Sequence, residues 1–373
     1  MRLTYVIGTT SGGVGTHVRA MAGRLVERGL TVTVAGPQST QEQFDFSAAG
    51  ALFVPVAIGS APNPRADLQV VRSLRRVLAD ADLVHAHGLR ATALSALALG
   101  RRRPDRKPLL STWHNAILER GVRRAALRLL ETVAARRSDL TMAVSSDLVS
   151  RAAGVGAPDA MLFPVAAPRL PAASRDRDLV RADLGVGDDD VVALAVGRAA
   201  PQKDYATLLD ATARWADDSH DSVAQPVVLV AGDGPELPAL GERVRSQRLP
   251  VRLLGHRTDV ADLLGAADLY VLTSRWEGRP LVIQEAMHAG LAVVATAGGG
   301  TPDLLGDAGR LVPVGDAAAI SAAVLELTSD RTARADLGQR ARQRAAEWPD
   351  EAANADALAT LYREQVARQA ARK

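Results

Sequence analysis

Two glutamates, Glu277 and Glu285, lie eight positions apart in the stretch SRWEGRPLVIQEAMHAG, across a turn formed by Gly278, Arg279 and Pro280. A helical pattern follows the turn, so Glu285 falls in its second turn. Free N–H groups at the start of this helix favour an anion near Gly278. A carboxylate in that place can accept hydrogen bonds from sugar or ribose hydroxyls. An ordinary surface ion pair is a weak explanation for Glu285, because neither position four residues away is basic.

Two cations stand close together in the stretch GRAAPQK, where Arg198 and Lys203 follow an apolar run. A planar guanidinium and a compact ammonium on one turn suit a diphosphate. Two solvated surface cations explain the spacing equally well. In AGDGPE, Gly232 and Gly234 flank Asp233, and as an isolated motif this pattern favours a tight turn.

The amino-terminal half carries a glycine loop, TTSGGVGTH, and several histidines at the ends of apolar runs. His17 closes the loop, His85 and His87 lie in ADLVHAHG, and His114 lies in STWHN. Histidines at strand ends beside a cleft can bind an acceptor. For His17, His85 and His87, a hydrogen-bonded core histidine remains an equal alternative.

Composition limits the function classes. The chain has 373 residues, 47% of them hydrophobic, and a net charge of +3, which suits two globular domains and gives no nucleic-acid footprint. It contains no cysteine, which excludes disulfides and thiolate metal sites. No signal-peptide pattern and no run of 18 apolar residues occur. We therefore expect a cytoplasmic protein.

Short apolar runs alternate with helical patterns along the chain, which predicts parallel βαβ units. The expected strands cover residues 3–8, 30–36, 81–88, 108–114, 140–145, 191–198, 226–234, 251–255, 267–274, 291–300 and 310–316. A proline-rich stretch without period, 163–185, reads as a linker. We predict an amino-terminal domain over 1–166 and a carboxyl-terminal domain over 167–354, with a helix over about 355–373 that can pack back on the first.

The chain resembles glycosyltransferase family 4. The signals are SRWEGRPLVIQEAMHAGLAVVAT, GRAAPQKDY, GDGPE, LGHRTDVADLLGAADLYVLTS and GGTPDLL, which occur in the family's order and are specific in combination. The resemblance implies the α/β GT-B fold, in which two doubly wound Rossmann-like domains face each other across a cleft. It also implies a nucleotide-sugar donor and a retaining reaction.

By this resemblance, Arg198 and Lys203 hold the donor diphosphate, Glu285 the ribose and Glu277 the sugar. His114, in a motif similar to T-x-H, contacts the donor sugar. His114, Glu277, Arg198 and Lys203 are thus the expected catalytic residues. The expected nucleotide-sugar site consists of Gly13, Gly15, Thr16, Arg198, Lys203, Gly232, Leu254, Arg257, Glu277, Gly278, Arg279, Pro280, Leu281 and Glu285.

The family's favoured mechanism is front-face attack, in which the leaving phosphate takes the acceptor proton. No metal ion and no cofactor are predicted, because two cations already face the diphosphate and the acidic run GDDDV reads as a solvated turn. One departure concerns the donor pocket. Many family members read E-G-F-G where this chain has Glu277, Gly278, Arg279 and Pro280, so Arg279 is expected to reshape the sugar pocket.

Segment 101–137 contains 11 basic and 3 acidic residues, a local net charge of +8. Its helical part places Leu118, Val122, Ala126, Leu129, Leu130 and Val133 on one face and arginines on the other. Such a helix either packs its apolar face on the sheet or lies on an anionic membrane surface. Peripheral attachment to the cytoplasmic membrane face therefore stays open.

The predicted function is transfer of a hexosyl unit from a nucleotide sugar to a hydroxyl acceptor in cell-envelope, glycolipid or polysaccharide synthesis. Alternatives are glycosylation of a small metabolite, a nucleotide-sugar epimerase and a non-catalytic binding protein of the same fold. An NAD(P)-dependent oxidoreductase fits poorly, because the third glycine of a dinucleotide loop is missing and the second strand ends without an acid.

Overall fold

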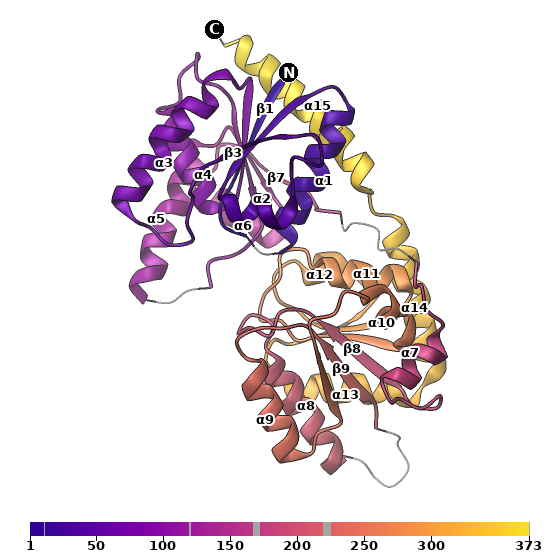
Figure 1. The fold of residues 1–373 in the computed structure, drawn as a ribbon. Coiled ribbons are helices and arrows are strands. Elements are labelled where there is room, and N and C mark those ends of the chain that lie inside the picture. The colour runs from indigo at the N-terminus through magenta and orange to yellow at the C-terminus, as the bar shows by residue number, and fades with distance from the viewer. Residues whose placement is uncertain (11, 119–120, 167–171, 219–224, 373) are drawn as a thin grey trace. The chain divides into compact units, whose positions relative to one another are not determined.

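The computed structural model describes residues 1–10, 12–118, 121–166, 172–218 and 225–372 (Figure 1). The chain forms two compact units, the first made of Met1–Pro168 and Pro349–Lys373 and the second of Arg169–Trp348. The return to the first unit comes at residue 349, before the whole last helix, and not at about 355. No helix in the described ranges is long and apolar enough to span a membrane.

The first unit is built on a seven-stranded sheet in the order β3-β2-β1-β4-β5-β6-β7, and all neighbouring strands are parallel. The chain runs outward from β1 in one direction and from β4 in the other. The strands are β1 (Arg2–Ile7), β2 (Thr31–Gly36), β3 (Leu52–Pro55), β4 (Leu83–His87), β5 (Leu109–Trp113), β6 (Leu140–Ala143) and β7 (Ala160–Leu162).

Helices cover both faces of this sheet, which is why its central strands are buried and apolar. Alternate residues of β1 point to opposite faces: Tyr5 packs with α1 and α15, and Val6 with α3 and α4. The helices are α1 (Gly13–Glu27), α2 (Gln38–Phe44), α3 (Pro64–Val77), α4 (Leu89–Leu99), α5 (Gly121–Arg137), α6 (Ser146–Gly154) and α15 (Glu351–Ala370), with a 3₁₀ turn η1 (Leu78–Asp80). Figure 1 shows α15 beside α1, where Arg28 binds Asp356 at 2.6 Å.

The second unit has a six-stranded parallel sheet in the order β10-β9-β8-β11-β12-β13. Its strands are β8 (Val192–Val196), β9 (Val227–Ala231), β10 (Val251–Gly255), β11 (Leu269–Leu272), β12 (Ala292–Thr296) and β13 (Arg310–Val312). Its helices are α7 (Arg177–Asp183), α8 (Tyr205–Asp218), α9 (Leu237–Gln247), α10 (Val260–Ala266), α11 (Leu281–Ala289), α12 (Thr301–Leu305), α13 (Ala317–Ser329) and α14 (Arg331–Ala346). The predicted pair of doubly wound α/β units is confirmed.

Several local predictions differ from the structure. Strands β3 and β7 were not expected, because both are short edge strands whose residues are half-buried or exposed and so carry little apolar pattern. Helix α1 begins at Gly13 and not near His17, and helix α7 lies inside the expected linker. Pro280 precedes α11 as its N-cap with ψ 117° and is not its first helical residue.

Helix α5 is buried only along its carboxyl-terminal half. Ala134 and Ala135 are fully buried, whereas Ala126 and Leu129 on the expected apolar face are exposed, Leu129 by 69%. The side chain of Val122 lies outside the described part. The expected packing of one continuous apolar face on the sheet is therefore wrong at Ala126 and Leu129.

Candidate active site

The two central loops of the second unit bring a lysine and a glutamate together. Strand order reverses between β8 and β11, which is where open α/β sheets bind ligands. Lys203 follows β8, and its Nζ donates to Oε1 of Glu277, which follows β11, at 2.7 Å. Ser274 Oγ donates to the same oxygen at 2.7 Å. The Glu277 carboxylate is therefore fixed by two donors at this edge.

The backbone around this pair is tied to its neighbours. Thr273 Oγ1 donates to the Lys203 carbonyl at 2.9 Å, and Gln202 Nε2 donates to the Trp276 carbonyl at 2.9 Å. Behind Glu277, a Cβ atom on Gly299 would lie 2.1 Å from the Glu277 carbonyl oxygen, and the φ of Gly299 is +65°. Only glycine fits there, so the close approach of these two loops depends on Gly299.

Arg198 is exposed and makes no hydrogen bond or ion pair with any residue that the structure describes. It follows Gly197 at the end of β8. A Cβ atom on Gly232 would lie 1.9 Å from the Gly197 carbonyl oxygen, and Gly232 N donates to Gly255 O at 2.7 Å. Gly232 is therefore required by close contact between neighbouring strand ends, whatever else it contacts.

Glu285 lies half-buried in α11 and has no hydrogen bond or ion pair within the described ranges. Burial raises the pKa of its carboxyl from 4.5 to about 7. Gly290 ends α11 in the left-handed conformation at φ +78°, as the sequence predicts. A half-buried carboxyl of this kind is common at functional sites, where a ligand supplies the missing partner.

The remaining residues expected to contact the nucleotide sugar are already engaged or are half-buried. Arg257 forms an ion pair with Asp259 at 2.5 Å, so it is not a free cation. The guanidinium carbon of Arg279 lies 5.0 Å from the centre of the Trp348 ring, and burial lowers the pKa of Arg279 to about 10. Leu254 and Leu281 are half-buried, Pro280 and Gly278 buried.

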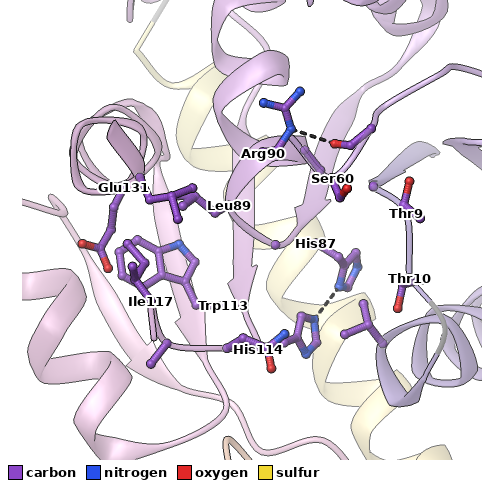
Figure 2. A pocket seen from close by; sticks show the side chains of 18 residues that line it. Thr9, Thr10, Ser60, His87, Leu89, Arg90, Trp113, His114, Ile117 and Glu131 are labelled. Atoms are coloured by element: carbon purple, nitrogen blue, oxygen red, sulfur yellow. Dashed lines mark hydrogen bonds between the residues drawn. The ribbon is translucent and has the colours of Figure 1, made fainter. Parts of the chain in front are cut away.

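A cavity of about 330 Å³ lies at the carboxyl edge of the first sheet, where strand order reverses between β1 and β4 (Figure 2). Loops after β1, β3, β4 and β5 surround it. Its lining comprises Gly8, Thr9, Thr10, Val14, Gly59, Ser60, His87, Gly88, Leu89, Arg90, Ala91, Trp113, His114, Asn115, Ala116, Ile117, Leu127 and Glu131. Two of the four expected histidines, His87 and His114, are among them.

The four histidines of the first unit form one cluster. His87 Nδ1 and His114 Nε2 share a hydrogen bond of 3.1 Å, and the His17 ring lies edge-on to both rings at 5.9 Å. Burial lowers the pKa of His17 to about 4 and that of His114 to about 3, and it holds the pKa values of His85 and His87 well below the usual range. All four rings are therefore neutral near pH 7.

His85 and His17 do not line the cavity. His85 Nδ1 binds the Tyr362 hydroxyl at 2.6 Å and its Nε2 binds Thr112 Oγ1 at 2.7 Å, so it is a satisfied core histidine. The expected acceptor contact of His85 and His17 is therefore not supported by their position. Tyr362 comes from α15, and nothing in its local sequence distinguished it from an ordinary core residue.

The glycine loop lies in the first turn of α1, where Gly13 is exposed and Thr16 half-buried. A Cβ atom on Gly15 would lie 2.2 Å from the Phe44 ring, so this glycine is needed for packing. Arg90 in the cavity wall was not predicted from the sequence. It binds Asp67 and the Gly59 carbonyl, each at 2.7 Å.

Other wall residues were also not expected. Glu131 forms a two-pronged ion pair with Arg151, and the indole nitrogen of Trp113 has no hydrogen-bond partner among the described residues. Trp113 could have been predicted as a wall residue, because it directly precedes His114 in STWHN. Within the described ranges, no group of three or more histidines and carboxylates could hold a metal ion.

Known proteins that are similar to this chain are glycosyltransferases. Residues 176–344 match the family model described as glycosyl transferases group 1, and residues 11–161 match that described as Glycosyltransferase Family 4. The chain is 31% identical over 358 residues, 89% of this chain and 85% of the relative, to a phosphatidyl-myo-inositol mannosyltransferase of Mycolicibacterium smegmatis. The chain belongs to glycosyltransferase family 4.

A second relative of this glycosyltransferase is an N-acetyl-alpha-D-glucosaminyl L-malate synthase of Bacillus anthracis, 25% identical over 70% of this chain and 69% of the relative. Two solved structures share its fold. The first is Anabaena HepE in complex with UDP, with a TM-score of 0.80 at 20% identity, and the match covers 98% of this chain and 100% of that one. The second is a sucrose-phosphate synthase of Thermosynechococcus elongatus, with a TM-score of 0.82 at 21% identity, and the match covers 99% of this chain and 100% of that one. The fold is GT-B, as expected. The relatives are glycosyltransferases, which decides against the oxidoreductase alternative.

Proposed function

We propose that this glycosyltransferase moves a hexosyl unit from a nucleotide sugar, held by the second unit, to a hydroxyl group of an acceptor held by the first, with retention of the anomeric configuration. The acceptor belongs to cell-envelope glycolipid or polysaccharide synthesis. Glycosylation of a small metabolite is the alternative, since the relatives named above include both a phosphatidyl-myo-inositol mannosyltransferase and a synthase that acts on malate.

One observation carries this proposal: the ion pair of Lys203 and Glu277 lies where strand order reverses in the second unit. Arg198 lies on the same loop as Lys203, and Glu285 lies on α11, the helix that follows the loop of Glu277. The free Arg198 and the Lys203 ammonium suit a diphosphate, while Glu277 and Glu285 offer oxygens to hydroxyl groups. Together these four side chains could bind both the diphosphate and the hydroxyl groups of a nucleotide sugar. HepE, a fold relative, was crystallised with UDP, which is consistent with this use of the fold.

The proposed chemistry follows from charge. When the bond between the anomeric carbon and the diphosphate breaks, the sugar becomes positive and the diphosphate more negative. Arg198, Lys203 and the amino end of α11 stabilise the departing charge without a metal ion. In front-face attack the departing phosphate takes the acceptor proton, so no side chain has to serve as the base.

The first test measures nucleotide binding. We expect one series among UDP, GDP, ADP and dTDP, with their sugar conjugates, to raise the melting temperature of the wild type. Glu285→Ala should lose that stabilisation, because the ribose loses its hydrogen-bond acceptor. Glu242→Ala is the matched control, since Glu242 is exposed and pairs only with Arg245 nearby. If no nucleotide stabilises the wild type at millimolar concentration, the proposal fails.

Retention is tested on the product. Once the donor is known, proton NMR of the transferred sugar gives its anomeric configuration. An α-linked donor should give an α-linked product. A β-linked product would contradict the retaining mechanism and leave the donor assignment intact.

We further propose that the amino-terminal half of α5 touches an anionic membrane surface when the acceptor is a lipid. Exposed Leu129 shares this half of α5 with exposed Arg124 and Arg128, which combines apolar area with positive charge. Leu118 is also exposed, but it precedes the helix, which begins at Gly121. Such a helix binds by insertion of its apolar side chains and by attraction to anionic headgroups.

Vesicle flotation tests this contact. The wild type should float with vesicles that contain phosphatidylglycerol and stay unbound with phosphatidylcholine alone. Leu129→Ser combined with Arg128→Ser should abolish flotation, whereas Leu311→Ser combined with Arg310→Ser, an exposed pair in the second unit, should not. Absence of flotation by the wild type would remove the proposal.

A further inference from the structure

The hydrogen bond between His87 and His114 in the cavity wall has a direction that the surrounding residues determine. Figure 2 shows the two rings side by side with this bond drawn between His87 Nδ1 and His114 Nε2, at 3.1 Å. Two neutral imidazoles can share one proton in two ways. Either His87 donates from Nδ1, or His114 donates from Nε2.

The other nitrogen of His87 distinguishes these two arrangements. His87 is 3% exposed, and its Nε2 is buried without a hydrogen-bond partner among the described residues. The rings of Tyr5, His85 and His17 pack against the His87 ring, with centroid-to-centroid distances of 5.0, 4.2 and 5.9 Å. If His114 donated, His87 would carry its proton on Nε2 as an orphaned N–H.

A buried N–H without an acceptor costs more and is rarer than a lone pair without a donor. His87 therefore carries its proton on Nδ1 and donates it to His114. His114 Nε2 is then the acceptor, and the proton of the neutral His114 ring must be on Nδ1. That nitrogen makes no hydrogen bond with any described residue, and His114 lines the cavity.

We propose that His87 is a positioning residue that holds His114 as the neutral tautomer with its proton on Nδ1. His114 then serves the reaction as a hydrogen-bond donor to a ligand oxygen and not as a base, because its only lone pair is occupied by His87. The role of His114 in catalysis rests on the proposed function. The assignment of its tautomer does not.

The neighbouring groups keep this arrangement neutral. His17 and His85 stand against the pair, and a charge on either ring would repel a charge on His87 or His114. His85 is bonded to Tyr362 and Thr112 and not to the pair, so it contributes packing without directing the shared proton.

Two substitutions of equal size separate donor from acceptor at His87. The side-chain amide of His87→Asn places an N–H near the former Nδ1, whereas the carboxylate of His87→Asp places only an acceptor there. His114 should keep its Nδ1 proton in His87→Asn. In His87→Asp, His114 must donate from Nε2, so its Nδ1 becomes a hydrogen-bond acceptor.

The direct measurement is long-range proton–nitrogen NMR of protein labelled with ¹⁵N-histidine, with the His114 signals assigned by comparison with His114→Gln. We expect protonated Nδ1 and unprotonated Nε2 for His114 in the ligand-free wild type and in His87→Asn. His85→Asn is the control and should lower the melting temperature without changing the His114 tautomer. A protonated Nε2 of His114 in the wild type would overturn the proposal, whether or not the variants fold.

The kinetic measurement uses the nucleotide sugar found by the binding panel. By analogy with other partners that fix a histidine tautomer, kcat should fall about 10- to 100-fold in His87→Asp. His87→Asn should stay within a few-fold of wild type with KM little changed. Equal losses in the two variants would show a merely structural role for His87. A failure of the proposed glycosyl transfer would appear separately, as absence of turnover by a wild type with the expected tautomer.

Discussion

The cavity of the first unit and the loops after β8 and β11 in the second occupy the same place in two similar sheets. The histidines at the first are neutral, and the groups at the second are charged. Each lies where strand order reverses at the carboxyl edge. In the first unit, burial keeps four histidines neutral. His87 and His114 bond to each other, and His85 bonds to two hydroxyl groups. In the second, Lys203 and Glu277 form an ion pair and Arg198 is exposed.

This difference shows that the fold provides the position and the side chains provide the chemistry. Neutral donors and acceptors can bind hydroxyl groups, which carry no net charge. Cations suit a diphosphate, whose charge grows during bond cleavage. The division of labour between the units that we propose rests on this difference, and four changes would break or sharpen it.

The largest effect should come from acid. Because the folded pKa values of His17 and His114, about 4 and about 3, lie below the usual 6.5, the stability they contribute is present above pH 6.5 and is lost as pH falls toward those values. Their combined effect on the first unit is on the order of 8 kcal/mol. Hydrogen exchange of α1 peptides at several pH values should show it.

The matching variant is His17→Gln, which cannot titrate. It should weaken the pH dependence of exchange in α1, even if it lowers stability at neutral pH. An unchanged slope would mean that the His17 ring is not kept neutral by the fold.

The second effect concerns the ion pair. Lys203→Met removes a preorganised donor from the diphosphate and should lower kcat/KM by about 10²- to 10³-fold, or ~2.7–4 kcal/mol. Steady-state kinetics with the identified donor measures this loss. Arg310→Met is the control, because Arg310 forms an exposed pair with Glu326 on the same sheet's edge. Activity of Lys203→Met within threefold or so of wild type would contradict the diphosphate role.

The third effect has the opposite pH direction to that of the histidines. The pKa of Glu285 is raised from 4.5 to about 7, so its contribution to stability is full below pH 4.5 and is lost as pH rises through about 7. The cost for the second unit is about 2–3 kcal/mol. Exchange of α11 peptides should increase over this range in the wild type and not in Glu285→Gln.

Nucleotide affinity should also report the ionisation of the Glu285 carboxyl. An ionised Glu285 is the better acceptor for ribose hydroxyls, so affinity should increase as pH rises through about 7. Glu285→Gln should bind weakly at every pH. An affinity that is independent of pH in the wild type would separate Glu285 from the nucleotide.

The smallest effect tests the core behind the cavity. Tyr362→Phe leaves His85 Nδ1 and the Tyr5 hydroxyl without a partner and should cost about 1–2 kcal/mol of stability. Tyr5→Phe removes only the 3.1 Å bond to Tyr362 and should cost less. Thermal unfolding measures both. A larger loss of turnover than of stability would show that the network extends functionally to the cavity.

Some of this could be predicted from the sequence because it is local. The hydrophobic period and the chain breakers predicted two doubly wound sheets. The turn at Gly278, Arg279 and Pro280, with the apolar pattern after it, predicted the helix that carries Glu285 and ends at Gly290. The edge strands β3 and β7 were missed, since half-exposed strands carry little apolar pattern.

What the tertiary structure alone decided are the contacts between distant segments. Lys203 meets Glu277 across 74 positions, His87 meets His114 across 27, and Tyr362 reaches His85 across 277. Local spacing carries no information about such pairs. Burial decided the rest: the same residue types become neutral histidines, a carboxyl with a pKa of about 7 or a fixed ion pair according to how much water the surrounding chain removes.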